Sequence, residues 1–467
     1  MRCFRYLTQH MSAQHQAQIA ANQSPSIVAW VRTRLSIMMF LQYAIWGAWL
    51  PLLWPYLFNV RKFTAIEIGW AFSVGAIGAI LAPFVAGQLA DRYFHTEKFL
   101  GISHIVGGIL VFQLASIETL LGFLAFSLVY SIVYSPTLSL TNSLSLHHID
   151  RNKDFGKVRL WGTVGWIVVG IGMGQWLLHL HTPASGTPSE IATAQFLGMA
   201  DAFKLSGVLG ILMGIYCFTL PSTPPSKGQQ KNATLKALAE VKYQPLIVLF
   251  LLAVPISCLH QFYFVHTSGF VGQYQAASGE DPFSKFVNSI FGVGGGGLMT
   301  IGQMSEVLVL ALIPALALRF SRKTLLAAGV VAYGLRMLLF GFSAKIAAIL
   351  GISEGIVLVT GIAMHGVCFG CFIFVSFMIV DEETTDDVRA SAQSLFNMVI
   401  VGFGIIVGSM AAGRVAMWAT VDGTMNYERL FSVPMFAALA CLIGLGVFYD
   451  SKAGKRAAQL RAGGSVA

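Results

Sequence analysis

The residues best suited to chemistry lie in a segment that otherwise suits a lipid bilayer. The segment TIGQMSEVLVLALIPAL, residues 300–316, is mostly apolar but carries one acid, Glu306. A charge at the bilayer centre costs about 2.5–3.5 kcal/mol on insertion scales, so it is rarely kept without a partner or a task. Gln303 lies three positions earlier, on the same helical face. The pair predicts an amide and a carboxyl facing a polar cavity, with Glu306 contacting substrate or exchanging a proton; the alternative is a buried structural pair with Arg336.

A second set of candidate site residues lies in the segment KVRLWGTVGW. Arg159, Thr163 and Trp166 are spaced i, i+4 and i+7, which places them on one stripe of a helix. A cation, a hydroxyl and an aromatic face suit a polar solute that contains a ring. For Arg159 the alternative is a side chain that extends to the cytoplasmic headgroups.

Two further apolar segments carry polar residues where lipid alone would disfavour them. CLHQFYFVHTSGF places His260, Gln261, Tyr263, Phe264 and His266 within seven residues, and so much polarity in mid-span predicts a water-filled path. MHGVCFGCF contains His365 and Phe369, four positions apart. Histidine titrates near neutral pH, so His365 could relay protons; the alternative is a hydrogen-bonded packing residue.

Composition identifies the elements that must position these residues. Of 467 residues, 55% are hydrophobic and 11% are charged, whereas soluble domains carry about 25% charged residues. The mean hydropathy is +0.69. The chain is therefore predicted to be an all-α polytopic membrane protein in contact with the lipid bilayer. Its net charge of +9 is then interpreted from its distribution over the loops, and we expect no nucleic-acid partner.

Apolar runs long enough to span a membrane predict the domain organisation. Twelve are found, at 35–58, 66–89, 97–117, 119–145, 158–181, 200–220, 244–273, 287–317, 323–344, 350–379, 388–416 and 428–449. A proline-rich and then basic stretch divides them six and six. We therefore predict an N-terminal segment (1–34), a six-helix bundle (35–220), a linker (221–243), a second six-helix bundle (244–450) and a tail (451–467).

The distribution of Lys and Arg predicts the orientation. With the N-terminus inside, inside segments hold twenty-one of these residues and outside segments hold six. Cytoplasmic loops carry the excess of positive charge, so both termini and the linker are predicted to be cytoplasmic. The N-terminus lacks the apolar core and cleavage site of a signal peptide. We expect a multi-pass protein of the cell inner membrane.

Several motifs limit the class of function. No arrangement of nucleophile, base and oxyanion donors is found, and no metal-ligand spacing, so we expect no enzyme activity, cofactor or metal. Cys368 and Cys371 form CFGC inside an apolar segment and are interpreted as reduced helix residues. GVGGGGLM follows no strand and lacks a Walker lysine; its glycines predict close helix packing.

Two bundles of six helices predict a substrate site at their interface, near the bilayer midplane. The loop GQLADRYFHTEK resembles the loop signature of the major facilitator superfamily. In it, Asp91 and Arg92 could bond neighbouring helix ends and latch one conformation.

Stretches across nearly the whole chain resemble one family, the nucleoside:proton symporters of the major facilitator superfamily. The matching stretches are FLQYAIWGAW, the Asp91–Arg92 loop, YSPTLSLTN, VRLWGTVGW, LPSTPP, GQMSE, GLRMLLF and VRASAQSLF. The resemblance implies a substrate site made of Arg159, Thr163, Trp166, Gln261, Phe264, Gln303, Glu306, His365 and Phe369, with Glu306 and His365 as candidates for proton coupling.

This sequence departs from the family pattern at four of the corresponding positions. Trp166 stands where a phenylalanine is usual, Phe264 replaces an asparagine, and His365 replaces a frequent tyrosine. Gly370 stands where typical members have an aspartate. The missing acid removes one candidate proton carrier, so Glu306, together with His365, must carry more of the coupling.

The resemblance implies a secondary transporter that imports nucleosides, or related ribosylated polar solutes, by alternating access with protons. We expect a monomer. A major facilitator carrier for sugars, an exporter and a non-transporting membrane receptor are the alternatives.

Overall fold

The computed structural model describes residues 25–85, 93–151, 153–224, 238, 240–385 and 388–450. In this part of the chain, twelve helical segments are long and apolar enough to cross a membrane. They are Ala29–Asn59, Ala65–Ala82, Thr96–Leu114, Leu120–His148, Phe155–Leu180, Pro188–Cys217, Leu246–Ala277, Gly296–Arg319, Arg322–Gly341, Glu354–Glu383, Ser391–Ala419 and Tyr427–Phe448. The predicted all-α membrane fold with twelve spans is confirmed.

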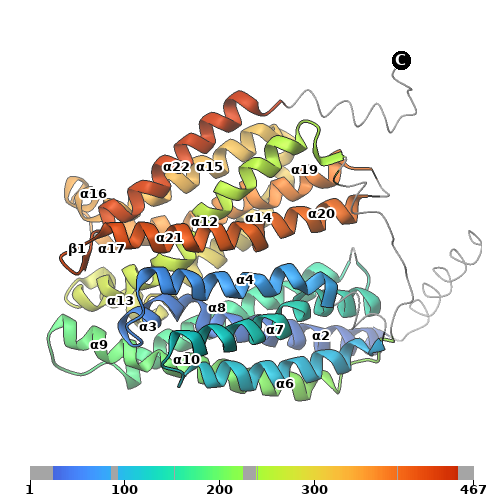
Figure 1. The fold of residues 1–467 in the computed structure, drawn as a ribbon, viewed down its shortest axis with the longest axis horizontal. Helices are drawn as coiled ribbons and strands as arrows, with labels where there is room; N and C mark the ends of the chain where they lie inside the picture. Colours follow the sequence, from blue (N-terminus) through green and yellow to red (C-terminus); the bar gives the residue numbers. More distant parts are fainter. Residues whose placement is uncertain are drawn as a thin grey trace, which may run out of the picture.

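The first six spans form one layer of the molecule, which runs from blue to green in Figure 1. Its elements are α2 (Pro25–Trp49), η1 (Leu50–Leu52), α3 (Leu53–Asn59), α4 (Ala65–Val85), α6 (Thr96–Leu114), α7 (Leu120–His148), α8 (Phe155–Leu180), α9 (Pro188–Gly198) and α10 (Ala200–Cys217). Small residues allow these helices to pack closely. A Cβ added to Gly108 of α6, for example, would lie 2.8 Å from the carbonyl oxygen of Gly207 in α10.

The last six spans form the second layer, from yellow-green to red. Its elements are α12 (Leu246–Ala277), α13 (Pro282–Phe291), α14 (Gly296–Arg319), α15 (Arg322–Gly341), α16 (Ser343–Leu350), α17 (Glu354–Ala363), α18 (His365–Cys368), the π-helix η3 (Phe369–Phe374), α19 (Val375–Glu383), α20 (Arg389–Asn397), the π-helix η4 (Met398–Gly404), α21 (Ile405–Ala419) and α22 (Tyr427–Phe448). A short antiparallel hairpin of β1 (Thr420–Val421) and β2 (Thr424–Met425) joins α21 to α22.

One predicted span is broken by a turn in the structure. The apolar run 287–317 is divided into α13 and α14 by a turn. Gly292, Gly294 and Gly295 in this turn have φ values of 70°, 81° and 79°, a region that favours glycine over residues with a Cβ. The glycine-rich motif therefore ends one helix and begins the next, which periodicity alone did not predict.

The two bundles meet at the end of the molecule that carries α9, α13, α16 and the hairpin, which we call the distal end (Figure 1). The backbone N–H of Val293 donates to the carbonyl of Gly174 at 3.0 Å. The Gln175 amide donates to the carbonyls of Ser289 and Ile290 at 2.9 and 3.0 Å. The Ser268 hydroxyl donates to the carbonyl of Pro51. The distal end is thus closed by direct contacts between the bundles.

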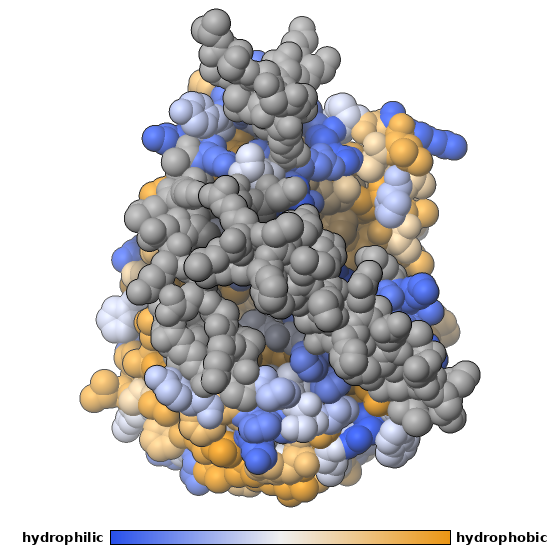
Figure 2. All heavy atoms as spheres, turned by 90° about the vertical axis from the view of Figure 1, so that its right-hand side faces the viewer, coloured by the Kyte–Doolittle hydropathy of each residue, from blue (hydrophilic) through white to orange (hydrophobic). Residues whose placement is uncertain are grey.

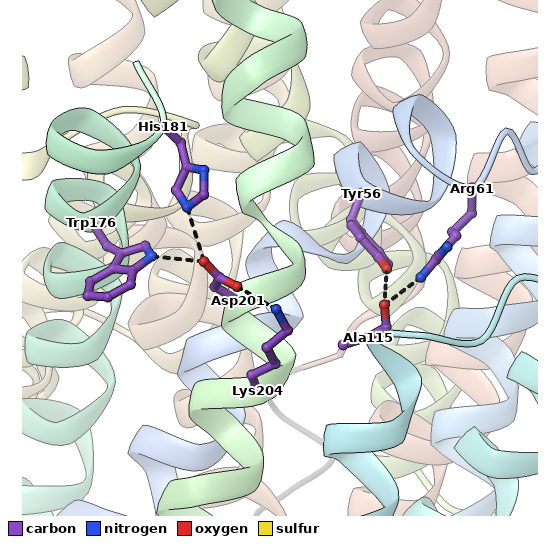
Figure 3. Close-up of polar contacts among 7 residues, drawn as sticks. All are labelled: Tyr56, Arg61, Ala115, Trp176, His181, Asp201 and Lys204. Carbon is purple, nitrogen blue, oxygen red and sulfur yellow. Dashed lines mark hydrogen bonds and ion pairs between the residues drawn. The ribbon is translucent and has the colours of Figure 1, made fainter. Parts of the chain in front are cut away.

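Polar contacts also fix the helices of the first bundle at the distal end. Asp201 of α10 accepts from Trp176 Nε1 at 3.1 Å and Lys204 Nζ at 2.9 Å, and lies 3.0 Å from His181 Nε2 (Figure 3). These bonds join the end of α8 to the start of α10. The opposite end, seen in Figure 2, carries hydrophilic side chains, while apolar ones cover the flanks.

Candidate functional site

A central cavity of about 430 Å³ lies between the two bundles. The first bundle contributes residues of α2, η1, α3, α4, α7 and α8, and the second contributes residues of α12, α14, α18, η3, α19, α20, η4 and α21. All nine predicted site residues line it: Arg159, Thr163, Trp166, Gln261, Phe264, Gln303, Glu306, His365 and Phe369. The structure thus brings them together, while their roles in substrate binding stay predictions.

The α8 stripe forms one wall of the cavity. The Arg159 guanidinium lies 4.1 Å from the ring centroid of Tyr43, in cation–π geometry. Trp166 packs edge-on against Trp46, with ring centroids 5.9 Å apart. Gly47 makes room for the Trp166 indole, since a Cβ there would lie 3.0 Å from it. Arg159 therefore lines the cavity and is held by an aromatic partner from α2.

A buried polar network supports this wall from behind. The Gln42 amide donates to Thr137 Oγ1 at 2.9 Å, and its oxygen lies 2.8 Å from His104 Nε2. Because an amide oxygen only accepts, His104 must donate through Nε2. The Tyr134 hydroxyl donates to the Gln42 carbonyl at 2.6 Å. The network joins α2, α6 and α7, and it fixes the helix that presents Tyr43 and Trp46.

The opposite wall carries the amides and the acid. The Gln261 amide donates to the Ser409 hydroxyl at 3.0 Å. The Gln303 oxygen is buried and has no hydrogen-bond partner within the described part of the chain. The Glu306 side chain is 20% exposed, and Arg159 acts on it electrostatically across the cavity.

Glu306 contacts His365 and not Arg336 directly. His365 Nε2 lies 3.4 Å from Glu306 Oε2, and the other ring nitrogen, Nδ1, lies 3.2 Å from Arg336 Nη1. A direct pair between Glu306 and Arg336 was the alternative given for this acid. The imidazole of His365 instead lies between the two side chains. Its ring stacks on Tyr263, with centroids 4.8 Å apart.

A π-helix follows His365 and positions Phe369. η3 begins at Phe369 and widens the turn in this stretch, a feature frequent at functional sites. The rings of His365 and Phe369 lie nearly parallel, with centroids 6.4 Å apart. Gly370 packs instead against α14, where an added Cβ would lie 2.7 Å from Val309 Cγ1.

Several cavity residues were missed by the sequence reasoning. Aromatic residues of the first bundle line the cavity, namely Tyr43, Trp46, Trp49, Phe72, Tyr130 and Tyr134. The spacing of Tyr43, Trp46 and Leu50 on one helical face was an available signal. The predicted latch residues Asp91 and Arg92 lie outside the described residues.

Comparisons with known proteins place the chain among transporters. YegT of Escherichia coli (strain K12) is 30% identical over 426 residues, which cover 88% of this chain and 92% of YegT. The nucleoside permease NupG of the same organism is 28% identical over 415 residues, which cover 86% and 92%. The crystal structure of nucleoside transporter NupG matches with a TM-score of 0.76 at 24% identity, covering 90% of this chain and all of that one.

The structural match confirms the predicted major facilitator fold with its two six-helix bundles. The sequence model of the family described as "Nucleoside H+ symporter" matches residues 30–453, which is most of the chain. This multi-pass membrane protein therefore belongs to the nucleoside H+ symporter family.

Proposed function

We propose that the protein imports nucleosides, or related ribosylated polar solutes, by alternating access and couples this import to protons. One observation carries the proposal: Arg159, Gln303, Glu306, Trp166 and Phe369 line a single cavity between two bundles. Its volume of about 430 Å³ lies within the range of small-molecule sites. Family membership and the permease relatives support it independently.

The chemistry of the lining suits a base attached to a sugar. Trp166 and Phe369 come from opposite bundles and would stack on the base. Thr163, Gln261 and Gln303, together with Arg159, would exchange hydrogen bonds with its polar edge and with the ribose. A site built on such bonds rejects analogues that lack the matching group, because its own polar groups would be left unpaired.

We assign proton coupling to the part of the cavity wall that carries Glu306. Glu306 is an ionisable group at membrane depth that faces the cavity, the usual position for a proton carrier in a transporter. His365 is the second candidate because it touches Glu306.

The cytoplasmic side proposed for the termini and the linker follows from the positive charge of the loops. We propose an inner-membrane monomer with cytoplasmic termini, bundles at 35–220 and 244–450, and a cytoplasmic linker at 221–243. A membrane-impermeant reagent should then label a C-terminal cysteine tag only after the cells are opened.

Uptake by the purified protein tests the function. Proteoliposomes should accumulate radiolabelled uridine when an inward proton gradient is imposed and only equilibrate it when the gradient is collapsed. Equal uptake under both conditions would show that transport is not coupled to protons, while the proposed nucleoside transport would stand. If sugars but not nucleosides compete with uridine for uptake, the substrate class is sugars and not nucleosides.

Glu306→Gln separates binding from coupling, since it keeps the shape of the side chain and cannot change charge. We expect this variant to exchange uridine between equal compartments and to lose gradient-driven accumulation. Accumulation at the wild-type level would demote Glu306 to a structural residue.

A further inference from the structure

Arg336 of α15 is a buried cation just behind the cavity. Its side chain is 0% exposed, and its Nε and Nη2 atoms have no hydrogen-bond partner in the part of the chain that the structure describes. Its guanidinium carbon lies 4.3 Å from the ring centroid of Tyr263 and 5.1 Å from that of Tyr333. Placing an ionisable residue at membrane depth costs free energy, and such residues mark functional sites. We therefore expect Arg336 to have a function.

The one side-chain hydrogen bond that Arg336 makes among the described residues fixes the proton position on His365. Arginine has donors and no acceptor, so the contact of Nη1 with His365 Nδ1 at 3.2 Å requires Nδ1 to accept. The ring proton then lies on Nε2. That atom lies 3.4 Å from Glu306 Oε2, so the neutral imidazole places its N–H beside the carboxylate.

We propose that Arg336 is a positioning residue for proton coupling: it holds His365 as the neutral Nε2–H tautomer, and Glu306 alone takes up the transported proton. The proposal rests on the proposed function and assigns its coupling step. The proton adds to a carboxylate oxygen of Glu306, the O–H bond forms, and the local charge rises by one. The charge-assisted contact with His365 is then lost, which frees the acid to change its partner within the cavity.

The charges around the imidazole disfavour His365 as the alternative proton carrier. A proton on His365 Nδ1 would place one N–H group against another and bring two cations together at the Arg336 contact. Among the described residues, the titratable and charged groups shown to contact this ring are Arg336 of α15, Glu306 of α14, and His260 and Tyr263 of α12. Tyr333 of α15 and Cys368 of α18 lie near Arg336. Glu306 is the only acid in this set.

The close packing of three helices maintains this geometry. A Cβ added to Gly302 of α14 would lie 2.8 Å from the Tyr263 hydroxyl and 3.0 Å from His365 Cβ. The Ser305 hydroxyl donates to the Ala363 carbonyl and accepts from the Gly366 N–H at 3.2 Å. The imidazole is thus confined between Tyr263, Arg336 and α14, which suits a group that orients another rather than one that moves.

Nitrogen NMR of histidine-labelled protein in bilayers tests the tautomer without any substrate. The difference between wild-type and His365→Gln spectra isolates His365. We expect one protonated and one bare ring nitrogen, with the proton on Nε2, from alkaline to mildly acidic pH. In Arg336→Gln an imidazolium signal should appear as the pH falls. An imidazolium or an Nδ1–H tautomer in the wild type would overturn the proposal.

Transport assays test the consequence for coupling. His365→Gln keeps an N–H group where Nε2 lies and does not titrate. Because His365 lines the cavity, the substitution should change the affinity for uridine and the rate of its uptake. The ratio of gradient-driven accumulation to exchange should nevertheless stay that of the wild type, since the proton carrier is still present. Arg336→Gln should acquire an additional titration that disappears in the double variant with His365→Gln. Arg336→Lys, which retains a donor, should restore the wild-type pH profile and controls for a folding defect.

The two failures are distinguishable. If His365→Gln exchanges uridine but no longer accumulates it, His365 is the carrier and the positioning role is wrong. If the wild type does not transport uridine at all, the proposed function fails, and the NMR experiment still decides the tautomer.

Discussion

At the residue scale, each polar group of the cavity is oriented by a partner from another helix. Arg159 of α8 lies over Tyr43 of α2, Gln261 of α12 donates to Ser409 of α21, and Glu306 of α14 meets His365 of α18. Such partners lock side chains before the ligand arrives, so less conformational entropy is lost on binding. The partners should therefore affect affinity through the residues that they orient.

Tyr43 offers a direct test of this idea. Tyr43→Leu removes the ring beneath the Arg159 guanidinium, whereas Tyr43→Phe keeps it. A cation–π contact in a partly exposed site contributes about 1 kcal/mol, so we expect the leucine variant to bind uridine about fivefold more weakly. The phenylalanine variant should bind like the wild type. Equal affinity of all three proteins, measured by calorimetry, would show that the ring does not orient Arg159.

Spacing along one helix was sufficient to predict some site residues but not their partners. Arg159, Thr163 and Trp166 share a stripe of α8, so their common cavity followed from the 3.6-residue period. The Glu306–His365–Arg336 chain joins three helices, and no local pattern specifies which helices touch. The sequence shows that these three residues are polar, whereas their contacts with one another can be seen only in the packed bundle.

At the element scale, glycines determine how closely the bundles approach at the distal end. A Cβ on Gly174 of α8 would lie 2.2 Å from the Phe291 carbonyl oxygen, and one on Gly292 would lie 1.9 Å from the Gly174 carbonyl carbon. Both are impossible contacts with backbone atoms. The closed distal end therefore depends on backbone surfaces that carry no side chain.

Gly174→Ala should shift the protein away from the state closed at the distal end. Overpacking costs about 1–3 kcal/mol, which corresponds to a population change of about 5- to 150-fold. Gly172→Ala is the matched control, since nothing lies within 4 Å of a Cβ at that position of the same helix.

The readout is the labelling rate of a cysteine placed at Thr300, which is 1% exposed at this contact, with the native cysteines replaced by alanine. We expect faster labelling with Gly174→Ala and an unchanged rate with Gly172→Ala. Equal rates for the two variants would mean that this contact does not govern closure.

The Asp281 carboxylate joins two elements of the distal end and should make their stability depend on pH. It caps α13 by accepting from the N–H and hydroxyl of Ser284, and it accepts from the Ser353 hydroxyl, each at 2.8 Å. The bond from Ser353, followed by those from Ser284, lowers the pKa of Asp281. Its stabilisation is therefore complete above the ordinary aspartate pKa of about 3.9 and is lost as pH falls through the lowered value.

Asp281→Ala should lower the free energy of unfolding at neutral pH by about 1 kcal/mol through the lost cap. The difference from the wild type should shrink in acid, as measured by thermal unfolding in detergent across pH. Asp281→Asn keeps an acceptor oxygen and should give a smaller difference that does not vary with pH. A difference for the alanine variant that stays constant into acid would contradict the ionic contribution.

Periodicity and hydropathy were sufficient to predict the spans but not their interruptions. Twenty or so apolar residues predict a crossing whatever the neighbours. The π-helices η3 and η4, and the break between α13 and α14, depend on contacts with other helices and on positive φ values at glycine. Those features lie at the cavity and at the distal contact.

At the scale of the whole molecule, the structure has one closed end and a cavity between the bundles. The contacts of Gly174, Gln175 and Ser268 with the opposite bundle all lie at the distal end. The cavity extends away from them to Phe377 and Asn397, near the junction of α19 and α20. Alternating access requires the distal contacts to separate once in each cycle.

Bridging Gln175→Cys to Ser289→Cys with a short bifunctional thiol reagent should therefore arrest transport and leave ligand binding intact. The Gln175 amide already reaches the Ser289 carbonyl at 2.9 Å, so the bridge holds the bundles as they lie here and leaves the cavity residues unchanged. A bridge between Tyr274→Cys and Ser284→Cys, whose hydroxyls lie 3.1 Å apart within the second bundle, controls for the reagent and should leave uptake unchanged. Continued uridine uptake by the first bridged protein would mean that the bundles need not part at this surface, and that the substrate crosses by another route.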